Sequence, residues 1–60
     1  MNADQIITRV TQASTDALAL DVLSGIPAVT LLAVADQLYV DAEGHGPAWV
    51  RKAIIREARA

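Results

Sequence analysis

The sequence predicts an all-α protein, a compact bundle of three to four short helices that self-associates. Three observations support this fold class. Apolar residues recur at spacings of three and four between the turn residues, the period of a helix with one buried face. Alanine, which favours helix and adds little volume, supplies 12 of the 60 residues. Apolar pairs such as Ile6-Ile7 and Ile54-Ile55 fall within this helical spacing and not in alternating strand-like runs.

The first predicted helix covers residues 3–12. Asn2 is a suitable N-cap, and Gln5 stands three positions later, the spacing of a capping box. Asp4 suits the positive end of the helix dipole. One narrow apolar stripe follows from the spacing, made of Ala3, Ile6, Ile7 and Val10. This is the most clearly amphipathic segment of the chain.

A second helix is predicted at residues 15–23, with Ser14 as its N-cap, Asp16 in its first turn and Gly25 just beyond its end. Leu20 and Ala17 point away from the apolar face. That face consists of Leu18, Ala19, Val22 and Leu23. One continuous helix over residues 3–23 is the alternative, because residues 11–15 contain no glycine or proline.

The central helix is predicted at residues 27–40, opening with Pro27 at the first helical position and closed by Gly44 and Gly46. We place Leu32 on its core face and expect Leu32→Ala to cost ~2–5 kcal/mol of stability. The other members of that face are Ala28, Leu31, Ala35, Leu38 and Tyr39.

The opposite side of the central helix is apolar too, since it includes Val29, Ala33 and Val40. A helix that is apolar nearly all round is normally covered on most sides. In so short a chain, either the flanking segments or a second copy must provide that cover.

The last helix is predicted at residues 47–59, where Pro47 follows Gly46 and opens the helix. Ile55 lies outside the apolar arc, among basic residues. The arc itself consists of Trp49, Val50, Ala53, Ile54 and Ala58.

Residues 31–58, LLAVADQLYVDAEGHGPAWVRKAIIREA, resemble small uncharacterised helical proteins of actinobacteria and their phages. The resemblance covers about half of the chain and includes no catalytic motif. It implies a small accessory protein, and it assigns no functional residue.

Length and composition indicate a single helical domain over residues 1–60. A core of this size rarely supplies more than ~3–5 kcal/mol without disulfides, a metal or oligomerisation. The chain has no cysteine and one histidine, so a disulfide and a Cys/His zinc site are both excluded within one copy. Oligomerisation, most simply a dimer, is the expected supplement.

The net charge of −2 gives no general attraction to nucleic acid or to an anionic membrane. No apolar stretch is long enough to cross a membrane, and the first residues do not have the pattern of a signal peptide. We therefore expect a cytoplasmic protein that does not bind membranes.

The polar loop at residues 41–46 contains Asp41, Glu43 and the only histidine, His45. These residue types could form a metal or acid–base site. The loop lacks the ligand spacing of a calcium loop and has no accompanying nucleophile motif, which favours a simple helix connector. We expect no cofactor, no metal, no catalytic residue and no small-molecule substrate.

Charge is distributed unevenly along the chain. Residues 47–60 carry a net charge of +3, and residues 1–46 carry −5. One interpretation is a DNA-binding, helix-turn-helix-like protein that uses the helix 47–59. The six-residue connector 41–46 is longer than the usual three or four, and the acidic remainder would repel phosphate.

The other interpretation is a non-catalytic protein-interaction or regulatory module, which we favour, in the role of a phage accessory protein with a host protein as partner. A basic helix and an acidic body attract one another between copies, or attract an acidic partner. Exposed aromatic and aliphatic side chains would add contact area. The candidate interaction residues are Val29, Tyr39, Trp49, Arg51, Lys52, Ile55, Arg56 and Arg59.

Overall fold

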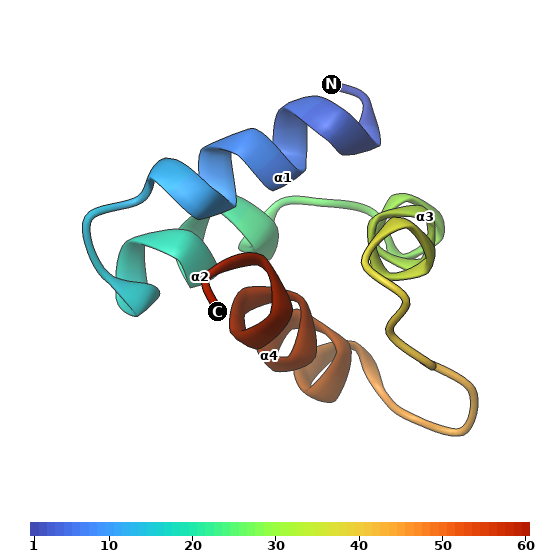
Figure 1. Cartoon of the computed structure of the whole chain (residues 1–60). Coiled ribbons are helices and arrows are strands. Elements are labelled where there is room, and N and C mark those ends of the chain that lie inside the picture. Colours follow the sequence, from blue (N-terminus) through green and yellow to red (C-terminus); the bar gives the residue numbers. More distant parts are fainter.

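The computed structural model describes residues 1–60 and contains four helices and no strand, which confirms the all-α prediction. Helices α1 and α4 form the middle of the bundle, while α2 and α3 lie at opposite ends (Figure 1). Both end helices pack on α1 and α4 but barely touch each other. The bounds are α1 Ala3–Gln12, α2 Asp16–Ser24, α3 Ala28–Gln37 and α4 Pro47–Ala58.

The first two helices begin with side-chain caps. The Asn2 and Gln5 side chains form the predicted capping box, each accepting a hydrogen bond of 2.9 Å from the other's backbone N–H. The chain then breaks before α2, which settles the choice between one and two helices in favour of two. Thr15, and not Ser14, is the N-cap of α2, since its Oγ1 accepts from the Leu18 N–H at 3.1 Å.

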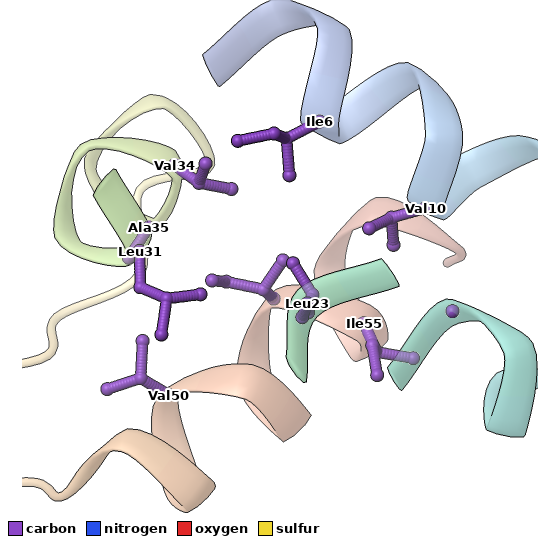
Figure 2. Packing of buried hydrophobic residues seen from close by; sticks show 10 residues of the cluster. Ile6, Val10, Leu23, Leu31, Val34, Ala35, Val50 and Ile55 are labelled. Atoms are coloured by element: carbon purple, nitrogen blue, oxygen red, sulfur yellow. The ribbon is translucent and has the colours of Figure 1, made fainter. Parts of the chain in front are cut away.

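The core draws apolar side chains from all four helices and contains no polar residue. Figure 2 shows these side chains converging between α1, α3 and α4, with Leu23 of α2 among them. Ile55 was expected outside the apolar arc, but it is only 9% exposed and belongs to the core, whereas Trp49 is exposed. The buried residues are Ile6, Val10, Ala19, Leu23, Leu31, Val34, Ala35, Val50, Ala53, Ile54 and Ile55.

Helix α3 is rotated relative to the prediction. Leu31, Val34 and Ala35 face the core, and Leu32 is 52% exposed. Successive helical residues are separated by about 100°, so Leu31 and Leu32 cannot both face the centre of one core. Since α3 is apolar nearly all round, the pattern of its own residues does not choose between them. The packing of α3 against α1 and α4 determines which of the two leucines is buried.

Helix α3 also starts and ends differently from the prediction. Pro27 is its N-cap and not its first residue. The helix ends at Gln37, well before Gly44, because Tyr39 takes a left-handed conformation with φ of 59°. The Tyr39 N–H donates to Asp36 O and the Val40 N–H to Ala35 O, the two bonds of a Schellman motif.

Gly25, expected to close α2 in the left-handed region, has φ of −96° and serves as an ordinary C-cap.

Arg59 ties the end of α4 to the junction of α1 and α2. Its Nη1 donates to Val10 O at 3.0 Å and to Ala13 O at 2.6 Å, and its Nε donates to Asp16 Oδ1 at 2.8 Å. The last carbonyls of a helix have no intrahelical partner, and a cation there also suits the helix dipole. One side chain therefore caps α1 and holds α4 against it.

Leu31 and Leu32 are a matched pair of leucines on adjacent positions. We expect Leu31→Ala to lower the free energy of unfolding by ~2–5 kcal/mol, because it leaves a cavity in the core. Leu32→Ala should cost about 0.5 kcal/mol in a dilute monomer, as for other surface positions. Urea unfolding followed by far-UV circular dichroism measures both. Equal losses would show that α3 is rotated differently.

Tyr39→Gly should stabilise the protein by about 1 kcal/mol, because glycine adopts the left-handed conformation without the steric cost of a Cβ. The tyrosine side chain is 96% exposed, so its removal loses no packing. Tyr39→Ala is the control, since it retains the Cβ and should give no such gain. Thermal unfolding of the two variants distinguishes them, and a less stable glycine variant would contradict the assigned helix end.

Arg59→Met should destabilise the fold by ~1–3 kcal/mol, because the α1 carbonyls lose their charged donor while the apolar part of the side chain is kept. Asp16→Asn is the matched control. It removes only the exposed ion pair, which contributes at most ~1 kcal/mol. Chemical denaturation of both variants tests the order, and a larger loss for Asp16→Asn would contradict the capping role.

Candidate functional site

The connector from residue 38 to residue 46 does not assemble a metal centre. Asp41 Oδ1 accepts from the Glu43 N–H at 3.1 Å, and the His45 N–H donates to Ala42 O at 3.1 Å, so these contacts turn the chain back toward α4. No group of three or more histidine, cysteine, aspartate or glutamate side chains is close enough to hold a metal ion.

The His45 side chain has a structural partner in α4. Its ring stacks on Trp49 with the ring centroids 3.6 Å apart and the planes within 10°. The two rings therefore lie face to face in van der Waals contact. The stack fixes the connector against the first turn of α4 and holds the indole of Trp49 at the surface, where it is exposed.

Exposed apolar side chains gather where α3 and the start of α4 meet. Val29 is 76% exposed, and Leu32 lies three positions further along α3, so the two are neighbours on the helix surface. Beside them is a hollow of about 140 Å³ whose bottom is formed by Leu31 and Val50. We call this surface the α3/α4 face, and it consists of Ala28, Val29, Leu32, His45, Pro47 and Trp49.

The six residues of the α3/α4 face include no aspartate, glutamate, lysine or arginine, and the exposed Asp36, four positions beyond Leu32, lies at its margin. Its carbon-rich surface lies on the side of α3 that faces away from the core. α2, at the opposite end of the bundle, cannot cover it (Figure 1). Exposed clusters of this kind in small proteins mark interaction surfaces more often than isolated apolar residues do.

A second hollow lies between α2 and α4. This α2/α4 groove has a volume of about 420 Å³ and is lined by Asp16, Ala17, Leu20, Lys52, Ile55 and Arg56. Its floor is apolar, and its rim carries charge. The expectation that Ala17 and Leu20 point away from the face that α2 buries agrees with their exposure.

The four basic residues of α4 and its C-cap have different surroundings. Lys52 and Arg56 are exposed at the α2/α4 groove. Arg51 is half-buried, with its Nε out of contact with solvent and without a hydrogen-bond partner. Arg59 is not free for a partner, because its guanidinium is bound to α1 and to Asp16. The basic surface proposed for DNA is therefore smaller than the sequence suggested.

The candidate interaction residues thus separate into several groups. Val29 and Trp49 belong to the α3/α4 face, Val29 beside Leu32 and Trp49 stacked on His45, and Lys52 and Arg56 line the α2/α4 groove. Tyr39 is exposed at the end of α3 and takes part in neither surface.

Ile55 was named as a contact on condition that it is exposed; it is 9% exposed and contributes only to the floor of the groove. Sequence reasoning missed Leu32 as a surface residue, and it did not assign His45 or Leu20 to a candidate surface. The apolar character of α3 and α2 beyond one face was the available signal.

No helix is long and apolar enough to cross a membrane. Comparison with protein-family models, curated proteins and solved structures returns no match to this chain.

Proposed function

We propose that this chain is a small, non-catalytic protein-interaction module, and that the α3/α4 face is where two copies of it meet. The observation that carries the proposal is the cluster of exposed apolar side chains around Val29, Leu32 and Trp49. Tryptophan is among the residues that supply most of the energy in protein interfaces, and the contacts around such residues exclude water.

The absence of charge on the α3/α4 face favours a second copy as its occupant. A two-fold axis places the same patch of both subunits in contact, so any charge near the axis meets an identical charge. The α3/α4 face avoids that repulsion when the axis lies on the α4 side of Leu32, away from the exposed Asp36. The α2/α4 groove, with Lys52 and Arg56 on its rim, does not.

The shape of the α3/α4 face supports the same pairing. Val29 protrudes, and the hollow above Leu31 and Val50 lies on the same surface. In a symmetric dimer the Val29 side chain of each copy can enter the hollow of the other copy, because every contact across a two-fold axis occurs twice. A hollow of about 140 Å³ accommodates one aliphatic side chain.

The size of the chain gives a reason for such pairing. A core of this size rarely supplies more than ~3–5 kcal/mol, and the buried residues here are few and mostly small. A standard interface buries about 800 Å² on each partner. The whole surface of this chain is 3895 Å², so the contact must extend along α3 and onto α4. Dimerisation would then add materially to stability.

The test is sedimentation equilibrium at micromolar to millimolar concentration. We expect the unmodified chain to dimerise reversibly and the double variant Val29→Glu/Leu32→Glu to be monomeric, because it places four carboxylates in one apolar contact. Leu18→Glu is the matched control, since Leu18 is 51% exposed on α2, outside the α3/α4 face. It should still dimerise.

Circular dichroism of each variant checks that the helices are retained. A chain that stays monomeric at millimolar concentration would contradict the proposal, as would a dimer that Leu18→Glu disrupts and the double variant does not.

A further inference from the structure

The α2/α4 groove combines an apolar floor with two cations and is separate from the α3/α4 face. Leu20 is exposed at the groove, and Ala17 and Ile55 complete the floor. Lys52 and Arg56 stand on the α4 side, four residues apart and therefore one helical turn from each other. Any occupant must match both features.

The positive charge of the groove is not cancelled within the chain. Asp16 also lines the groove, but its carboxylate is paired with Arg59 Nε at 2.8 Å. Arg56 Nε lies 3.7 Å from Glu57 Oε1, and both side chains are largely exposed. Exposed ion pairs of this kind contribute little. Lys52 and Arg56 therefore remain available to a carboxylate partner.

We propose that the α2/α4 groove binds an acidic amphipathic helix of another protein. That helix carries two carboxylates one turn apart, which pair with Lys52 and Arg56. Its leucine or isoleucine side chains cover Leu20 and Ile55. An amphipathic helix placed in a groove is a recurring mode of peptide recognition. The inference rests on the proposed function in assigning a protein partner, but it uses a different surface.

A second copy of the chain does not supply such a helix. α1, α3 and α4 each carry a single acidic residue, and the two of α2, Asp16 and Asp21, are five positions apart. None of the four helices therefore offers two carboxylates at a spacing of three or four. Asp16 is also engaged with Arg59. The occupant must come from a different protein.

Nucleic acid fits the groove less well. Phosphates would pair with the two cations but would leave Leu20 in contact with water. Residues 1–46 carry a net charge of −5, which repels a polyanion at a distance. A short peptide with few charges meets less of that repulsion and covers the apolar floor.

The probe is a capped, fluorescein-labelled helical peptide with glutamates at positions i and i+4 and leucines on the adjoining face. Fluorescence anisotropy measures its binding to the full chain. We expect micromolar affinity, with Lys52→Glu and Arg56→Glu each weakening binding about tenfold or more. Leu20→Ser should weaken it as well. Arg9→Glu is the matched control, because it makes the same charge change at an exposed site on α1, outside the groove.

Two further probes identify the class of ligand: the same peptide with serine in place of leucine, and a DNA duplex. Both should bind at least about tenfold more weakly than the leucine peptide. No binding of the leucine peptide would overturn the proposal. So would equal binding of either further probe, or an equal loss with Arg9→Glu.

The double variant Val29→Glu/Leu32→Glu should retain peptide binding. If the unmodified chain stays monomeric and binds the peptide, only the proposed dimer is contradicted. If the unmodified chain dimerises and does not bind the peptide, only this inference is overturned.

Discussion

The packing of α3 against α1 and α4 alone is the constraint on which the rest of the structure depends. α2 lies at the other end of the bundle, so it does not cover the outer side of α3 (Figure 1). The core uses the inner side, through Leu31, Val34 and Ala35. The outer side keeps Val29 and Leu32 in contact with water, which is a cost that a second molecule can remove.

The polar interactions that stabilise this fold are concentrated at the helix ends. The core holds no polar residue. The helix ends are stabilised by the capping box of α1, the Thr15 cap of α2 and the Schellman motif of α3. Arg59 adds three long-range hydrogen bonds that join the end of the last helix to the first two, and Thr11 Oγ1 adds another by donating to Ala58 O. Such a structure has a well-defined fold with a small core, and several of its apolar side chains stay exposed.

The sequence predicts the existence and type of the helices well where caps and a distinct polar face coincide, as for α1 with its Asn2–Gln5 box and α4 with Pro47 after Gly46. The sequence does not predict which side of α3 faces the core, because the helix is apolar nearly all round and its residue pattern does not distinguish one side from another. The left-handed Tyr39 has no local signal, since glycine is the residue expected there.

Four residues of the two candidate surfaces were named from the sequence: Val29, Trp49, Lys52 and Arg56. The contacts of Arg59 with Val10 and Ala13, and the burial of Ile55, depend on tertiary packing and could not be predicted from the sequence.

The central claim, that two copies meet through the outer side of α3, is tested most directly by isotope-filtered NMR on a mixture of labelled and unlabelled chain. The account predicts intermolecular nuclear Overhauser effects from the Val29 and Leu32 methyl groups to the α3/α4 face of the other copy. A concentrated sample that shows none of these, or shows them only at other surfaces, would contradict it.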